Sequence, residues 1–181
     1  MELGKTLEVA NREEWRQWLA RNHDKAKEIW LVYHRRASGR SRVSYDEAVE
    51  EALCYGWIDS TVKNVNDDSF AQRFTPRRPG RPISEMNKER VRRLLAAGRM
   101  TPAGLAVIGD IESRLHIPAD ILAELQSDDR TWANFQQFPE SYRIIRVAFV
   151  EGARTRPQEF RRRLNHLIKA TAQGKMFGMV K

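Results

Sequence analysis

The chain has very little cysteine: Cys54 is the only one among its 181 residues. A single cysteine excludes an intrachain disulfide and any zinc cluster built from several cysteines. Long hydrophobic runs are also missing, since apolar stretches such as residues 147–150 are far shorter than the roughly 20 residues that cross a bilayer. No apolar segment of signal-peptide length follows Met1, so we expect a cytoplasmic protein without a membrane span.

The short motifs that carry common enzyme chemistry are absent as well. The sequence contains no phosphate-binding glycine loop, no dinucleotide fingerprint, no nucleophile elbow, and no HExxH or CxxC. Its four histidines lack the spacing of metal ligands. Cys54 falls at the end of a predicted helix, where the helix dipole disfavours a thiolate, and this favours a packing role. The sequence therefore specifies no enzyme, no cofactor and no metal site.

One acidic cluster leaves an alternative open. Glu47 and Glu51 are four residues apart on one face of a predicted helix, a spacing at which two carboxylates can hold a hard cation weakly. Acids near a helix N-terminus also stabilise the helix dipole without any ligand. We favour the second interpretation, because the sequence offers no third ligand position.

The net charge of +8 is unevenly distributed along the chain. Residues 73–99 carry nine basic and two acidic side chains, whereas residues 1–72 have a net charge of −2. Eight of the nine basic residues are arginines, whose planar guanidinium recognises phosphate and carboxylate groups through paired hydrogen bonds. The segment therefore indicates an anion site or, alternatively, a solvated arginine-rich surface.

Length and an apolar content of 41% are typical of a soluble globular chain with one domain or two small ones. Residues 1–112 mix strand and helix patterns, so we expect an α+β domain with a small antiparallel sheet and flanking helices. Residues 116–178 show only helical patterns, which predicts an all-helical C-terminal domain. The predicted helices of this second domain begin at Pro118, Asp128, Pro139 and Pro157.

Within the first domain, the spacing predicts strands at residues 6–10 and 28–34, and a hairpin with strands at 57–66 and 69–75. The valines of the first hairpin strand do not alternate cleanly, so we expect a bulge or a slip there.

Helix boundaries carry their own signals. Asn11 with Glu14 and Ser44 with Glu47 are capping pairs that mark two helix starts. Gly56 suits the left-handed position that ends the second of these helices.

Four blocks of sequence support a resemblance to a known family. They are residues 54–60 (CYGWIDS), 73–78 (RFTPRR), 87–91 (NKERV) and 98–104 (GRMTPAG). In order and spacing these blocks resemble the YdeI/OmpD-associated family, also called bacteriocin-protection proteins, and residues 117–175 are similar to that family's helical C-terminal domain. The resemblance covers nearly the whole chain. It implies a bacterial cytoplasmic protein linked to tolerance of bacteriocins or antimicrobial peptides, which is a phenotype rather than a reaction.

The predicted hairpin brings aromatic, acidic and basic side chains together at its base, because the two strands are antiparallel. We expect Asp59 to orient one guanidinium through a bidentate pair, beside an aromatic wall. Alternate residues of a strand share a face, so Arg73 and Arg77 should point to one side, with Arg77 exposed. A structural ion pair with the tryptophan in the core is the alternative. The predicted ligand-binding residues are Trp57, Asp59, Arg73, Arg77, Lys88 and Arg92.

These observations predict a stress-tolerance protein that binds an anionic small molecule or a protein partner without catalysing a reaction. The charge of +8 makes direct capture of cationic bacteriocins unattractive. The alternative is a nucleic-acid-binding protein that uses the arginine-rich segments 73–99 and 154–163. Neither a helix-turn-helix nor an aromatic pair typical of RNA recognition can be identified in the sequence.

Overall fold

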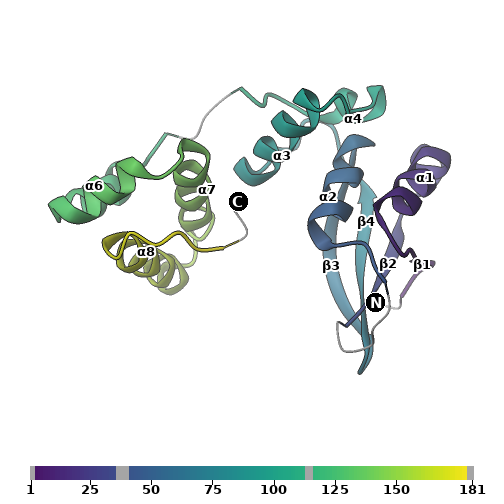
Figure 1. The fold of residues 1–181 in the computed structure, drawn as a ribbon, viewed down its shortest axis with the longest axis horizontal. Coiled ribbons are helices and arrows are strands. Elements are labelled where there is room, and N and C mark those ends of the chain that lie inside the picture. The colour runs from purple at the N-terminus through teal and green to yellow at the C-terminus, as the bar shows by residue number, and fades with distance from the viewer. Residues whose placement is uncertain (1–2, 36–40, 113–115, 179–181) are drawn as a thin grey trace. The chain divides into compact units, whose positions relative to one another are not determined.

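The structure is a computed structural model that describes residues 3–35, 41–112 and 116–178 (Figure 1). Contacts divide the chain into two compact units. The N-terminal unit holds Met1–Ile83 and Arg90–Ile111, and the C-terminal unit holds Ser84–Glu89 and Glu112–Lys181. The first unit is built around a sheet and the second consists of helices, which confirms the expected α+β class.

The N-terminal unit contains a four-stranded sheet with the strand order β1-β2-β4-β3. The elements of the first 112 residues are β1 (Thr6–Glu8), α1 (Arg12–Asn22), β2 (Ile29–His34), α2 (Tyr45–Cys54), β3 (Trp57–Asn66), β4 (Ser69–Pro76), α3 (Glu85–Ala96) and α4 (Pro102–Val107). The division between the units falls within α3, whose first residues up to Glu89 are assigned to the C-terminal unit. Strand β1 runs parallel to β2, because α1 carries the chain back between them. The sheet is therefore mixed, whereas the sequence pattern predicted an antiparallel one.

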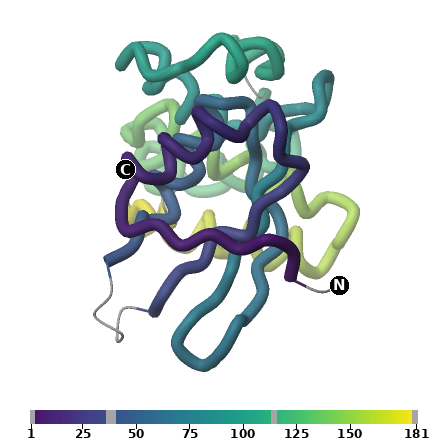
Figure 2. The backbone as a smooth tube through the Cα atoms, turned by 90° about the vertical axis from the view of Figure 1, so that its right-hand side faces the viewer, coloured from purple at the N-terminus to yellow at the C-terminus, as the bar shows by residue number. Residues whose placement is uncertain are grey.

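The hairpin of β3 and β4 is irregular, as the valine pattern predicted. Asp59 opposes Phe74 but Val62 opposes Gln72, so β3 holds one extra residue between these pairs, and a second shift follows near the turn. Figure 2 shows this hairpin as a long loop of the tube that extends beyond the shorter β1 and β2.

Local signals in the sequence form the expected helix ends. The side chain of Asn11 accepts a hydrogen bond from the amide of Glu14. Ser44 and Glu47 form a reciprocal capping box at the start of α2. Gly56 has a φ of +74°, the left-handed conformation in which glycine avoids the steric cost of a side chain.

The main hydrophobic core lies between one face of the sheet and helices α1 and α2. Trp15, Leu53, Trp57 and Phe74 are completely or almost completely buried there. The opposite face carries a smaller cluster in which Trp30 is fully buried. Arg73 lies on this opposite face, because it is adjacent in the strand to the core residue Phe74.

The C-terminal unit packs four helices around a second core. They are α5 (Ala119–Gln126), α6 (Asp129–Gln137), α7 (Glu140–Glu151) and α8 (Pro157–Ala172). The buried residues of this core are Ile121, Leu125, Phe135, Val147, Val150, Leu164 and Leu167. In the part of the chain that the structure describes, no helix has the length and apolar character needed to cross a bilayer.

Candidate anion-binding site

Three of the four sequence blocks meet at the C-terminal end of α2. The carbonyl of Cys54 accepts hydrogen bonds from the amide of Thr101 (3.2 Å) and from its hydroxyl (2.5 Å). The carbonyl of Gly56 accepts one from the amide of Arg77 (2.8 Å). A Cβ added to Gly104 would lie 2.3 Å from the Cys54 oxygen, so α4 can pack this closely only because glycine stands there. The blocks thus build a tight junction between α2, β4 and α4.

Cys54 is fully buried at this junction. Burial and the nearby Glu51 carboxylate both raise the pKa of its thiol. A neutral, inaccessible thiol suits packing and does not suit nucleophilic attack.

The first predicted site residue, Trp57, belongs to the core. It is 1% exposed, its ring meets that of Trp18 edge-on, and its indole N–H donates to the carbonyl of His23 (3.0 Å). A ligand therefore has no free face of this ring to contact, and the expected aromatic wall is absent at Trp57.

Asp59 and Arg73 do not form the expected bidentate pair, because they lie on opposite faces of the sheet. Asp59 opposes Phe74 and so faces the helices, where it accepts hydrogen bonds from Tyr45 (3.1 Å) and Gln72 (2.7 Å). On the other face, Arg73 forms an ion pair with Glu28. The expectation failed because the register of the hairpin places Asp59 beside Phe74.

The two predicted residues on α3 have partners close to them. Lys88 forms an ion pair with Glu85 (2.8 Å), one helical turn away. Arg92 donates a hydrogen bond to the carbonyl of Ile111. The structure thus distributes the six predicted residues over separate environments and does not assemble them into one pocket.

Arg77 has a buried guanidinium without a neutralising acid. Its residue is 8% exposed, which corrects the expectation that this side chain lies open to water. It donates to the carbonyl of Arg81, while its Nε has no hydrogen-bond partner. Burial lowers the pKa of Arg77, and no carboxylate among the described residues forms an ion pair with it. A buried charge in this state is costly unless an anion compensates it.

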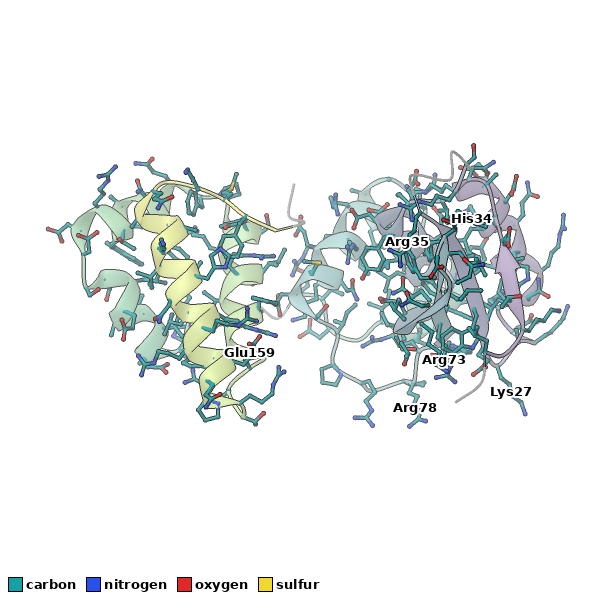
Figure 3. The ribbon with its side chains drawn as sticks, turned by 90° about the horizontal axis from the view of Figure 1, so that it is seen from below. Lys27, His34, Arg35, Arg73, Arg78 and Glu159 are labelled. Atoms are coloured by element: carbon teal, nitrogen blue, oxygen red, sulfur yellow. The ribbon has the colours of Figure 1, made fainter. Side chains whose placement is uncertain are left out.

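The surroundings of Arg77 form a basic end of the sheet, which we define as residues 23–28 and 73–82. These segments contain six lysines and arginines against two acids. Figure 3 shows Lys27, Arg73 and Arg78 at one end of the N-terminal unit and His34 and Arg35 at the other. The register agrees, since Ile29 opposes Phe74 and thus aligns the start of β2 with the end of β4.

Most other cations of the arginine-rich segments are neutralised. Arg90 pairs with Asp46, and Arg99 pairs with Glu51. In the second segment, Arg154 pairs with both Asp120 and Glu151. Glu159, labelled in Figure 3, holds two further arginines of α8. Among the described residues, Arg77, Arg78 and Arg81 stand out as a short loop of cations without ion pairs.

A cluster that sequence reasoning missed surrounds Glu51, which is fully buried. Its carboxylate binds Arg12 (2.5 Å), Arg16 (2.5 Å) and Arg99 (2.6 Å). Burial alone raises the pKa of Glu51, but hydrogen bonds from the three guanidiniums outweigh it, so the pKa lies below its usual value. With Glu51 so engaged and Glu47 in the capping box, the structure gives no support to a cation site at these acids.

Acid should therefore weaken the N-terminal unit through Glu51. Because the folded-state pKa lies below the ordinary value of 4.5, the contribution of Glu51 is complete above pH 4.5 and is lost as the pH falls through the lower folded value. We expect urea midpoints to fall from pH 6 to pH 3, and to fall less in Glu51→Gln. Tryptophan fluorescence can follow this, since four of the five tryptophans lie in residues 15–57. An equal fall in both proteins would contradict the assignment.

Comparison with protein families gives two matches. Residues 7–107, more than half of the chain, match the family described as a domain of unknown function, DUF8412. Residues 114–174 match the family described as Bacteriocin-protection, YdeI or OmpD-Associated. Comparison with curated proteins and with solved structures finds no match.

The two matches assign the two parts of the chain to different families, whereas the sequence blocks suggested one family for nearly the whole chain. The four N-terminal blocks lie within the first match, so the similarity to bacteriocin-protection proteins is located at residues 114–174 rather than over nearly the whole chain. Residues 114–174 are thus similar to the YdeI/OmpD-associated, bacteriocin-protection family, and the chain belongs to the DUF8412 family, whose model matches more than half of it.

Proposed function

We propose that the chain is a cytoplasmic stress-tolerance protein that binds a small anion at its basic end and catalyses no reaction. The observation that carries the proposal is Arg77, a buried guanidinium with an unpartnered Nε and no ion pair among the described residues. The match to bacteriocin-protection proteins at residues 114–174 supports the tolerance role.

The chemistry of the loop suits a phosphate or carboxylate group. A guanidinium offers several N–H donors in a plane, and bidentate hydrogen bonds to an oxyanion are about twice as strong as neutral ones. Arg78 and Arg81 are exposed and lie beside Gly80, which has a φ of +75° and turns the loop. Three arginines within five residues can therefore surround one anionic group.

A small anion fits these charges better than a polyanion. Affinity for nucleic acid comes largely from many cations that neutralise phosphates together, about six to ten in a strongly salt-dependent complex. The arginines of segment 154–163 are largely held by acids of their own unit, and those of residues 90–99 by acids of theirs. The remaining cations of the loop suffice for one or two charges.

Replacing Arg77 by methionine tests the proposal. The change keeps the volume of the side chain and removes its charge, so we expect binding of pyrophosphate, measured by calorimetry, to fall at least about tenfold. The free energy of unfolding should stay equal or rise, because an uncompensated buried charge is removed without leaving a cavity.

Arg21→Met is the matched control, since Arg21 is exposed on α1 and the net charge changes equally. Binding that falls by the same factor in the control would reduce the effect to overall charge and overturn the site. Unfolding of Arg77→Met would make Arg77 a structural residue and overturn it as well. A steeply salt-dependent mobility shift with duplex or single-stranded nucleic acid would favour the alternative function.

A further inference from the structure

The second half of α8 and the chain that follows it form a groove of about 530 Å³ in the C-terminal unit. Volumes of about 300–1,000 Å³ are typical of sites for small organic ligands. The lining includes Asn165, His166, Lys169, Lys175, Met176 and Phe177. None of these residues belongs to the basic end of the N-terminal unit.

One wall of the groove is apolar and firmly held. The amide of Phe177 donates to the hydroxyl of Tyr142 (3.1 Å), and its ring stacks on that of His166 with centroids 4.3 Å apart. Met176 is 54% exposed. An apolar ligand surface can therefore be buried here against Phe177, whose position is already set, with Met176 beside it.

The charge of the groove is positive. Lys169 and Lys175 line it, and of the described residues that line it none is acidic. Backbone groups already cap the end of α8, because the amide of Lys175 donates to the carbonyl of Ala170 and that of Gly174 to Thr171. The two ammonium groups are thus not needed to satisfy the helix end, and neither forms an ion pair among the described residues.

A third cation lies behind the apolar wall. Arg146 is 5% exposed, and the rings of Tyr142, Phe149 and Phe177 surround its guanidinium with centroids 5.1–5.7 Å away. Its Nε has no hydrogen-bond partner, and no acid among the described residues forms an ion pair with it. Aromatic rings attract a cation but do not cancel its charge, so Arg146 adds to the positive potential on the groove.

We propose that this groove binds a small organic anion with an apolar body, such as an aromatic sulfonate or carboxylate. The acid group lies between Lys169 and Lys175, and the apolar body packs against Phe177 and Met176. This site is independent of the anion site proposed at Arg77, because it uses other residues in the other unit and requires an apolar body as well as a charge.

The probe for the test is 8-anilinonaphthalene-1-sulfonate, which carries one sulfonate on an aromatic body and fluoresces when bound to an apolar surface. We expect the full-length protein to bind it saturably at a single site. The double variant Lys169→Gln/Lys175→Gln should bind at least about tenfold more weakly, since it loses the charge-assisted contacts. The uncharged analogue N-phenyl-1-naphthylamine should bind the unchanged protein equally weakly.

The double variant Arg21→Gln/Arg130→Gln is the matched control, because it removes two exposed cations outside the groove and gives the same net charge. It should retain probe binding, as should Arg77→Met. Equal weakening in the control would show a general charge effect, and equal affinity for the uncharged analogue would show an apolar patch only; either overturns the proposal. Weakening in Arg77→Met alone would place the probe at the basic end and overturn it too. Near-ultraviolet circular dichroism verifies that each variant is folded.

Discussion

Glu51→Gln should lower the free energy of unfolding of the N-terminal unit by about 3 kcal/mol, the scale for breaking a buried ion pair from one side. The carboxylate is fully buried and binds three guanidiniums. Two of them, Arg12 and Arg16, come from α1, and the third, Arg99, comes from the turn after α3. Glutamine keeps the shape but brings an amide N–H₂ against cations and removes the carboxylate that all three guanidiniums share. Urea unfolding at pH 7, followed by tryptophan fluorescence, measures the change.

Glu50→Gln is the control for that result. Glu50 lies next to Glu51 on the same helix but is partly exposed, and it pairs with Arg12 (3.0 Å) and, more loosely, with Arg93 (3.6 Å). Pairs near the surface usually contribute about 1 kcal/mol or less. A loss in Glu51→Gln no larger than in Glu50→Gln would show that the buried cluster does not stabilise the unit.

Gly104→Ala is expected to have an effect of similar size, for a steric reason. The new Cβ would lie 2.3 Å from the carbonyl oxygen of Cys54 and 2.8 Å from two further backbone atoms, so α4 must move away from α2. Overpacking of this kind typically costs about 1–3 kcal/mol, and the upper end applies because backbone cannot rotate aside. Thermal unfolding should show a clearly lower midpoint.

Gly109→Ala provides the comparison, since a Cβ at Gly109 meets nothing within 4 Å and its φ is not positive. Its effect on stability should stay within about 0.5 kcal/mol, as for most open surface sites. If both alanine variants unfold at the same temperature, the close approach of α4 to α2 is not the reason for glycine at position 104.

The sequence predicted those structural features that depend on residues only a few positions apart. The residues of a capping pair are three positions apart, and the left-handed glycine follows within two residues of the end of its helix. Both helix boundaries could therefore be predicted from the sequence. The α+β class followed from the same local patterns, summed over the first 112 residues. The parallel pairing of β1 was missed, because strand direction depends on how α1 crosses the sheet.

The candidate site was harder to predict, because its contacts join distant residues. Arg73 binds Glu28, 45 positions away, and the partners of Glu51 lie 35 to 48 positions away. Adjacency at the hairpin base did suggest that Asp59 and the arginines meet, but the register turns Asp59 toward the helices. The burial of Arg77 could not be predicted either, because it depends on packing that no local pattern in the sequence reports.

The irregular register of β3 also affects whether the sheet can pair edge to edge with another molecule. Within the described residues β3 pairs only with β4, so its other side is an edge of backbone amides and carbonyls that another strand could join. Two extra residues interrupt that row, and Lys63 places a charge between them. Breaks and charges of this kind are how natural sheets prevent edge-to-edge aggregation. The same bulge that separates Asp59 from the pairs after it therefore disfavours the addition of another strand along this edge of the sheet.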